Sequence, residues 1–436
     1  MMSSDTIFAL SSGPPPSGVA VVRISGPAAF DAVGRLAGDL PKRRATLLRA
    51  VRNRDGDLID KGLVLSFPGP RSFTGEDCVE LQLHGGRAVV AAVSAELSHL
   101  GLRLAEAGEF THRAFDNGKM DLVEVEGLGD LIAADTEMQR RLAIEQSAGG
   151  LSTRYAAWAN RLTKARALIE AELDFADEDD VPGSVSEQVW ADVAQVQREI
   201  ALQIDATQKA DAVRDAFKVV IIGPPNAGKS SFMNAFAKRD VAIVTEIAGT
   251  TRDVLEVELD LQGFLVRLSD TAGLRETTDV VEREGVRRAL GTAQKADLLL
   301  ALTEIDSDTK WSVGHELNIP TLRIGTKSDL HPWSRDAFDF VVSTSTGVGL
   351  DDVRKEILAR VELAWNSIAS LGAGRMRHVE HLTRASNFLA EALSGAELDI
   401  RAESLRLAAM ALGRITGRVD VEDLLDVIFS EFCIGK

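Results

Sequence analysis

The chain has 436 residues, 45% of them hydrophobic and 26% charged, which is enough for about three domains with cores of their own. Its formal net charge of −17 excludes nonspecific coating of nucleic acid, because that mode depends on neutralising phosphates with Lys and Arg. No apolar run approaches the ~18 residues of a membrane span, and the first residues lack a secretory signal pattern. Two cysteines, Cys78 and Cys433, are too few for a disulfide framework, so we expect a cytoplasmic protein without a membrane partner.

Residues 1–118 have the pattern of an α+β domain. Short strand-like runs broken by Gly and Pro are predicted at Val19–Gly26, Leu63–Phe67 and Cys78–Gly86. A basic segment, PKRRATLLRAVRNR, is either a local RNA-binding patch or a solvated edge. Its cations are Lys42, Arg43, Arg44, Arg49, Arg52 and Arg54.

From residue 119 the sequence becomes rich in Ala, Leu, Glu and Arg with few breakers, which predicts long amphipathic helices up to residue 216. The acidic run Asp174–Ser184 interrupts them with a Pro-Gly turn. Helical pattern returns at 367–436. These two stretches predict a discontinuous helical domain.

Between the helical halves, residues 217–366 alternate strands with helices, which is the pattern of a doubly wound sheet. The predicted strands are Lys218–Gly223, Val254–Leu261, Phe264–Asp270, Asp297–Thr303, Thr321–Thr326 and Asp339–Thr344. The sequence therefore predicts a multidomain protein of α/β and α+β parts, with an α/β domain inserted into a helical one.

A phosphate-binding motif opens the inserted domain. GPPNAGKS (Gly223–Ser230) fits G-x-x-x-x-G-K-[ST], follows an apolar strand and opens a helix. Its backbone N–H groups would cradle phosphates at the positive end of that helix. Lys229 would bring a charge to the terminal phosphates, and Ser230 a hydroxyl to Mg²⁺. The alternative, a chance Gly-rich turn, does not account for the strand before it and the helix after it.

Two further motifs have the character of GTPase switches. AGTTRD offers Thr251 as a ligand of Mg²⁺ and of the γ-phosphate. DTAG ends a strand, where Asp270 can reach the Mg²⁺ shell and the Gly273 amide the γ-phosphate. Both lie where open α/β sheets bind ligands, at the carboxyl ends of strands.

TKSD (Thr326–Asp329) supplies the base specificity, because the Asp329 carboxylate can accept two N–H bonds from guanine and adenine lacks that pair of donors. Thr326 stands where Asn is usual, which removes one amide near the base and puts guanine affinity in doubt. Together the motifs predict a Ras-like P-loop GTPase. The predicted GTP-binding residues are Asn226, Ala227, Gly228, Lys229, Ser230, Ser231, Thr245, Glu246, Ile247, Ala248, Gly249, Thr250, Thr251, Asp270, Thr271, Ala272, Gly273, Thr326, Lys327, Ser328, Asp329, Ser343, Thr344 and Ser345.

The group that orients the attacking water is not evident from the motifs. Ras-like enzymes place Gln directly after DTAG, whereas this chain has Leu274. The acidic residues that follow are each candidates or ordinary surface charges: Glu276, Asp279, Glu282 and Glu284. Asn226 could hold a monovalent cation beside the phosphates, or it could simply suit the backbone geometry of the loop.

The motifs as a set resemble those of the MnmE (TrmE) family of tRNA-modification GTPases, over about residues 5–436. The matching pieces are DTIFAL, VVRISG, SFTGED, ELQLHGG, GEFTHRAFDNGKMDLVEVE, DFADEDD, GPPNAGKSSFMNAF, IAGTTRD, DTAGLRE and FCIGK. The GTPase pieces are shared with many families, whereas GEFTHRAFDNGKMDL and FCIGK are close to diagnostic.

The resemblance implies a homodimer formed through an N-terminal domain that is similar to folate-dependent aminomethyl-transfer proteins. It implies an FAD-dependent MnmG (GidA)-type partner, in a heterotetramer or larger complex. Together they would add a (carboxymethyl)aminomethyl group to carbon 5 of the wobble uridine (position 34) of certain tRNAs, using 5-formyl- or methylene-tetrahydrofolate.

The resemblance also assigns residues. It implies folate contacts at Arg23, Glu80, Lys119 and Lys436. It implies a K⁺ site, used when G domains pair across the dimer, at Asn226, Thr245, Ile247 and Thr250. Glu282 matches the catalytic, water-orienting glutamate of the family.

The segment FCIGK returns to the folate pocket in the family, which makes Cys433 a second catalytic candidate. A thiolate could add to the uracil ring if Lys436 lowers the pKa of the thiol, or Cys433 could be a packing residue. Cys78 is expected in the core, and His378 with His381 on a solvated helix face.

Two other functions compete with tRNA modification. One is a ribosome-associated or assembly GTPase switch without uridine chemistry, which needs neither Cys433 nor the folate residues. The other is a stand-alone nucleotide hydrolase, against which TKSD and the paired switch motifs argue.

Overall fold

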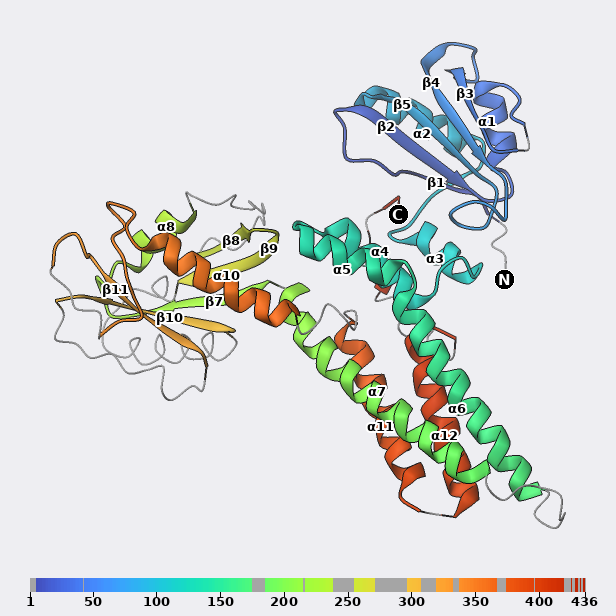
Figure 1. The fold of residues 1–436 in the computed structure, drawn as a ribbon. Helices are drawn as coiled ribbons and strands as arrows, with labels where there is room; N and C mark the ends of the chain where they lie inside the picture. Colours follow the sequence, from blue (N-terminus) through green and yellow to red (C-terminus); the bar gives the residue numbers. More distant parts are fainter. Residues whose placement is uncertain are drawn as a thin grey trace, which may run out of the picture. The chain divides into compact units, whose positions relative to one another are not determined.

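The computed structural model describes residues 5–41, 43–174, 185–214, 216–237, 255–270, 296–306, 319–331, 337–366, 374–395 and 397–418, and positions 425, 428, 429, 432, 434 and 435. The chain forms two compact units. The first comprises Met1–Gly129, Ser147–Asn160 and Ala409–Lys436, and the second Asp130–Gln146 and Arg161–Ala408. No helix in the described ranges is both long enough and apolar enough to cross a bilayer. Figure 1 labels the elements.

The first unit contains a six-stranded sheet in the order β3-β4-β5-β2-β1-β6, antiparallel except for the pair of β1 and β6. One face packs against two helices and forms a continuous apolar core with them (Figure 1). The elements are β1 (Ile7–Leu10), β2 (Ser17–Ser25), α1 (Ala29–Ala37), β3 (Ala45–Arg52), β4 (Leu58–Phe67), β5 (Cys78–Gly85), α2 (Arg87–His99), β6 (Arg103–Leu104) and α3 (Glu109–Asp116).

Alternation along the strands sends every second side chain to the other face of this sheet. Arg23 of β2 lies opposite Glu80 of β5 and opposite Ala9 of β1 in the ladder, so the three side chains share that face. Ala9 joins a small buried cluster with Phe110 of α3. The core face is therefore structural, and the opposite face carries charged residues.

Three strands of this sheet, β1, β3 and the two-residue β6, were not predicted. β3 lies within the basic segment, where charges at Arg49 and Arg52 obscure its alternation. The structure shows β3 as an edge strand, and two arginines just outside its ends have partners: Arg44 donates to Arg71 O at 2.9 Å, and Arg54 pairs with Glu96. Cys78 is buried as predicted.

The helical elements are α4 (Leu122–Ala133), α5 (Glu137–Ser147), α6 (Gly150–Asp174), α7 (Val185–Arg214), α11 (Met376–Leu393) and α12 (Leu398–Ile415). In the second unit α7 packs along α11 (Figure 1). The Arg401 guanidinium of α12 lies 3.3 Å from the centre of the Trp190 ring of α7. Arg161 of α6 forms ion pairs with Asp192 and Glu199 of α7.

The expected solvated face of His378 and His381 is wrong. Both side chains are buried, on the same stripe of α11 as Val379, Leu382 and Ala385. The i, i+3 spacing that suggests one helix face is correct, but that face packs inward rather than toward water.

The inserted domain has a second six-stranded sheet in the order β12-β11-β10-β7-β9-β8, parallel except for β8. Its elements are β7 (Phe217–Ile222), α8 (Lys229–Ala237), β8 (Leu255–Leu261), β9 (Phe264–Asp270), β10 (Leu298–Glu304), β11 (Thr321–Thr326), β12 (Phe340–Val341) and α10 (Leu350–Asn366). The predicted combination of an α+β domain, a helical domain and an α/β domain of P-loop type is thus confirmed.

The last described residues return to the N-terminal domain within the first unit. Phe429 and Phe432 pack with Leu122 of α4 in one apolar cluster. Ile434 forms an antiparallel bridge with Ala107. Ser11 donates its hydroxyl to Gly435 O at 2.7 Å. Cys433 and Lys436 lie outside the described residues.

Gly435 is required by this docking. Its φ is +98°, and a Cβ there would lie 2.2 Å from the Leu10 carbonyl oxygen. We predict that Gly435→Ala releases the segment, because the clash adds to the left-handed strain. Hydrogen exchange of residues 428–435 should accelerate by about tenfold or more, equivalent to a loss of about 1.4 kcal/mol.

Gly101→Ala is the matched control, since Gly101 has a φ of +86° with open space around it. Equal exchange in the two variants would contradict the steric explanation.

Candidate functional site

The P-loop connects β7 to α8, and two features of its backbone fix its path. A Cβ on Gly223 would lie 2.2 Å from Leu302 O, so the loop passes too close to β10 for any side chain. Asn226 and Gly228 have φ angles of +63° and +85°, the left-handed region that Asn and Gly tolerate best. The Asn226 side chain is exposed.

Lys229, the first residue of α8, is buried although it is charged. Its ammonium group donates to Gly223 O at 2.9 Å and to Pro224 O at 3.0 Å. The carbonyls of the loop thus hold the cation beside the loop's N–H groups and the positive end of the helix. This arrangement is suited to a polyphosphate.

Ser230, a predicted magnesium ligand, contacts Asp270, which was predicted to reach the magnesium shell. Asp270 ends β9, which runs parallel to β7, and its side chain is fully buried. The Ser230 hydroxyl donates to an Asp270 carboxylate oxygen at 3.1 Å. Hydroxyl and carboxylate oxygens are ligands that Mg²⁺ accepts, so this part of the donor set fits the ion.

Thr326 stands where Asn is usual, and it still forms a hydrogen bond to the P-loop. Its buried hydroxyl donates to Ala227 O at 2.8 Å, and Thr303 O lies 3.4 Å away. The base-recognition loop and the P-loop are therefore joined directly. The effect of this Thr on guanine affinity stays a prediction.

The carboxylate predicted to recognise guanine, that of Asp329, is held by hydroxyl groups. Ser345 donates to Asp329 at 2.7 Å, and the hydroxyls of Ser343 and Ser345 are 2.9 Å apart. Hydrogen bonds from Ser343 and Ser345 hold the pKa of the Asp329 carboxyl below its usual value. The group therefore stays ionised at neutral pH, as an acceptor of two N–H bonds must be.

Sequence reasoning missed Glu304, at the end of β10. Its carboxylate accepts a 2.6 Å hydrogen bond from Lys327, and that bond holds the pKa of Glu304 below its usual value. His331 lies 3.3 Å from the same carboxylate. Only its place at a strand end could have pointed to this residue.

Of the other described residues predicted to bind GTP, Gly228, Ser328 and Thr344 lie in the loops after β7, β11 and β12, and Ser231 lies in the first turn of α8. The remaining predicted residues lie outside the described part of the chain. They are Thr245, Glu246, Ile247, Ala248, Gly249, Thr250, Thr251, Thr271, Ala272, Gly273, Glu282, Cys433 and Lys436.

A second polar cluster lies on the charged face of the N-terminal sheet. The Arg23 Nε donates to a Glu80 carboxylate oxygen at 2.9 Å, and both side chains are about one-fifth exposed, at 20% and 18%. The same guanidinium carbon lies 5.1 Å from the centre of the Phe73 ring and 5.7 Å from that of Phe110. A cation between two rings has one strongly preferred position.

Lys119, the third predicted folate residue, reaches the loop that carries Phe73. Its ammonium donates to Pro70 O at 2.8 Å. Arg23, Glu80 and Lys119 are therefore linked through one loop. A flat heterocycle with amide-like N–H groups and acidic substituents fits an acid flanked by two cations and an aromatic ring.

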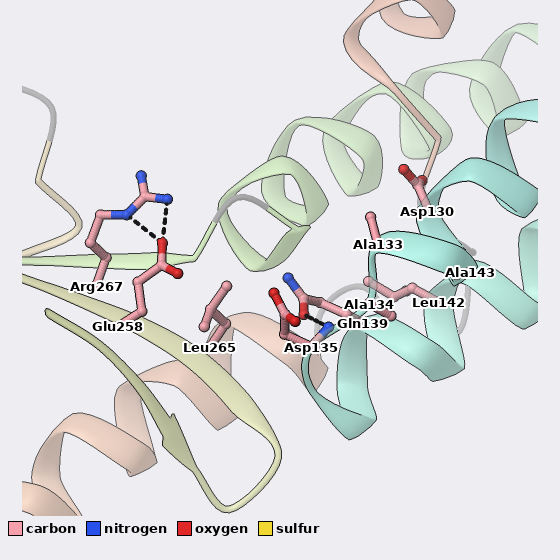
Figure 2. A pocket seen from close by; sticks show the side chains of 10 residues that line it. All are labelled: Asp130, Ala133, Ala134, Asp135, Gln139, Leu142, Ala143, Glu258, Leu265 and Arg267. Atoms are coloured by element: carbon pink, nitrogen blue, oxygen red, sulfur yellow. Dashed lines mark hydrogen bonds and ion pairs between the residues drawn. The ribbon is translucent and has the colours of Figure 1, made fainter. Parts of the chain in front are cut away.

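A cavity of about 420 Å³ lies elsewhere, in the second unit. Figure 2 shows side chains from α4 and α5 on one side and from β8 and β9 on the other, with Arg267 paired to Glu258. None of the predicted site residues lines this cavity, so it is separate from both clusters.

Two family models match the chain: "GTP-binding protein TrmE N-terminus" over residues 6–119 and "MnmE helical domain" over residues 122–433. The tRNA modification GTPase MnmE of Sinorhizobium medicae is 58% identical over 100% of both chains. That of Agrobacterium fabrum is 57% identical over 100% of this chain and 99% of its own, and that of Brucella anthropi 52% over 99% and 98%.

The chain belongs to the tRNA modification GTPase MnmE family. Among solved structures, the G domain of the T. maritima FeoB iron transporter is 21% identical over 34% of this chain and 99% of its own, with a TM-score of 0.26. The assignment to the MnmE family does not depend on that similarity, since it rests on relatives that match along their whole length.

The Thr326 tie yields a prediction for nucleotide affinity. Thr326→Val keeps the shape but leaves Ala227 O without its buried partner, so GTP and GDP should bind about fivefold to tenfold more weakly, from a loss of about 1 kcal/mol. Isothermal titration measures this. Thr326→Ser keeps the hydroxyl and should bind GTP and GDP as the wild type does. If Thr326→Val also binds them with wild-type affinity, the hydrogen bond to Ala227 O is not needed for nucleotide binding.

Proposed function

We propose that this member of the MnmE family hydrolyses GTP in its inserted domain and uses a one-carbon tetrahydrofolate to modify the wobble uridine of certain tRNAs. The product is a (carboxymethyl)aminomethyl group at carbon 5. The carrying observation is similarity to MnmE proteins at 51–58% identity over nearly the whole chain, together with two polar sites in separate units. Family membership supports the GTPase activity and the tRNA substrate.

For GTP hydrolysis, Mg²⁺ would be held by Ser230 with Thr251, and Asp270 would lie close to its shell. The buried Lys229 and the loop N–H groups would neutralise the phosphates as charge develops on them. Glu282 would orient the attacking water by hydrogen bonding, since an ordinary glutamate is ionised near neutral pH.

A K⁺ ion would add positive charge where no arginine finger is evident. Asn226, Thr245, Ile247 and Thr250 would hold it. The left-handed backbone and exposed side chain of Asn226 leave its amide oxygen available for such an ion. The proposal otherwise rests on the family resemblance.

For the uridine chemistry, Glu80 would accept N–H bonds from the pterin ring of the folate, and Arg23, Lys119 and Lys436 would meet the carboxylates of its glutamate tail. Ile434 and Gly435 contact the N-terminal domain at Ala107 and Ser11, which supports a role in this chemistry for the neighbouring Cys433. Its thiolate would then be a candidate nucleophile toward the uracil ring.

Exposed apolar residues on the N-terminal sheet bear on the proposed homodimer. Leu48 and Leu63 are paired across β3 and β4, and their side chains are 73% and 39% exposed on one sheet face. Such exposed apolar residues on a sheet face support a homodimer through the N-terminal domain. An FAD-dependent MnmG (GidA)-type partner and a cytoplasmic location complete the proposal.

The decisive test is mass spectrometry of tRNA nucleosides from cells with and without this protein. We predict that aminomethyl-type wobble uridines disappear on deletion and return with the wild-type chain but not with Cys433→Ser, because serine lacks a comparable nucleophile. Cys78→Ser is the control for loss of a thiol, since Cys78 is buried and a serine hydroxyl can keep its hydrogen bonds to Thr74 and Ser25.

If the modified uridines return with Cys433→Ser, Cys433 is a packing residue rather than a nucleophile. If deletion leaves the uridines unchanged, the modification proposal fails and a ribosome-associated or assembly GTPase switch becomes the better reading.

The K⁺ site gives a separate prediction. GTP hydrolysis should be faster in K⁺ than in Na⁺ at equal ionic strength, and Asn226→Ala should abolish that difference while GDP binding stays within about threefold. Steady-state phosphate release in the two salts measures this. Hydrolysis that is equal in K⁺ and Na⁺ for the wild type would contradict the cation site.

A further inference from the structure

The loop that connects β4 to β5, residues 68–77, is held in place from both sides. Asn117 donates its amide to Thr74 O at 2.7 Å, and Lys119 donates to Pro70 O. Gly75 has a φ of +82°, and a Cβ there would lie 3.0 Å from the Asn117 Cβ. The loop is therefore packed closely against the segment that follows α3.

Buried and part-buried hydrogen bonds from β2 and α3 also hold the loop. Arg113 of α3 is 5% exposed and forms ion pairs with Asp5, Glu76 and Glu109. The Ser25 hydroxyl donates to Glu76 at 2.7 Å and lies 2.7 Å from the Thr74 hydroxyl.

These contacts pair the buried guanidinium of Arg113 with three carboxylates, of which those of Glu76 and Glu109 are largely covered and that of Asp5 is 41% exposed. Burial alone would lower the pKa of the Arg113 guanidinium, but the surrounding carboxylates raise it above its usual value. Removing one partner of such a network leaves the others uncompensated, so the network holds the loop in one conformation.

What the loop presents is Phe73. Of the two rings that flank the Arg23 guanidinium, Phe110 is fully buried, so its faces are covered by protein. Phe73 is 37% exposed. Of these two rings, it is therefore Phe73 that can offer aromatic surface to a molecule bound at Arg23 and Glu80.

We propose that Phe73 contacts the flat ring of the bound folate and that Arg113 is a positioning residue that holds the loop carrying it. This inference rests on the proposed function, the binding of a one-carbon tetrahydrofolate at Arg23 and Glu80. Stacking on an aromatic ring suits a bicyclic heterocycle whose edge is bound by an acid and a cation.

The test is titration of the full chain with 5-formyltetrahydrofolate, with GTP hydrolysis and thermal unfolding measured alongside. Phe73→Ala should weaken binding about tenfold or more, and Phe73→Trp, which keeps an aromatic face, should bind within about threefold of the wild type. Phe30→Ala is the control: it truncates a half-buried Phe that packs on the other face of the sheet.

The positioning role of Arg113 is tested through its partner, so that the buried cation itself is kept. Glu76→Gln removes one carboxylate of the network and should weaken folate binding about threefold to tenfold with an unchanged rate of GTP hydrolysis. Glu403→Gln removes a carboxylate from an exposed ion pair with Arg406 and should have no effect. Phe73→Trp combined with Glu76→Gln should bind as weakly as Glu76→Gln alone.

Arg23→Ala separates the outcomes. If the wild type binds folate, Arg23→Ala does not, and Phe73→Ala binds normally, the proposal for Phe73 is overturned while the folate site stands. If the wild type does not bind folate, the proposed function fails and this inference fails with it. If Phe73→Ala changes the oligomeric state but not folate binding, a second copy of the chain covers the ring and the proposal is equally overturned.

Discussion

Packing of Ile428, Phe429, Phe432, Ile434 and Gly435 against residues of the first 122 positions is the contact on which the first unit depends. Two glycines permit it. A Cβ at Gly108 would lie 2.4 Å from Phe429 O, and one at Gly435 would lie 2.2 Å from Leu10 O, so backbone meets backbone at both places. The phenyl rings of Phe429 and Phe432 bury the apolar surface that stabilises this contact. Residues far apart in the sequence thereby share one unit, and an entire GTPase domain can be inserted between them.

The two candidate sites use the same physical device, which is a loop held by hydrogen bonds from its neighbours. In the inserted domain, loop carbonyls hold Lys229, and Thr326 joins the base-recognition loop to the P-loop. In the N-terminal domain, the buried Arg113 and the exposed Lys119 hold the loop of Phe73 beside Arg23. Such preorganised groups lose little entropy when a ligand binds, which is why both are suited to recognition.

Much of the GTP site was predictable from the sequence, because each of its motifs is a short run of adjacent residues at a strand end. Strand β3 was not, because its arginines obscure the alternation of the strand. His378 and His381 were placed wrongly, since burial depends on which face of α11 meets α7. The pair of Arg23 and Glu80, 57 positions apart, depends on strand register, and only the family resemblance pointed to it. Glu304 carried no motif at all.

The central claim is that one-carbon chemistry takes place at a site built from the N-terminal domain and residues 432–436, apart from the GTP site. The most direct measurement compares the full chain with a variant lacking Phe432–Lys436, titrated with 5-formyltetrahydrofolate and assayed for GTP hydrolysis. We predict that the variant loses folate binding about tenfold or more, while its hydrolysis rate stays within about twofold. Unchanged folate binding in the shortened chain would contradict the account.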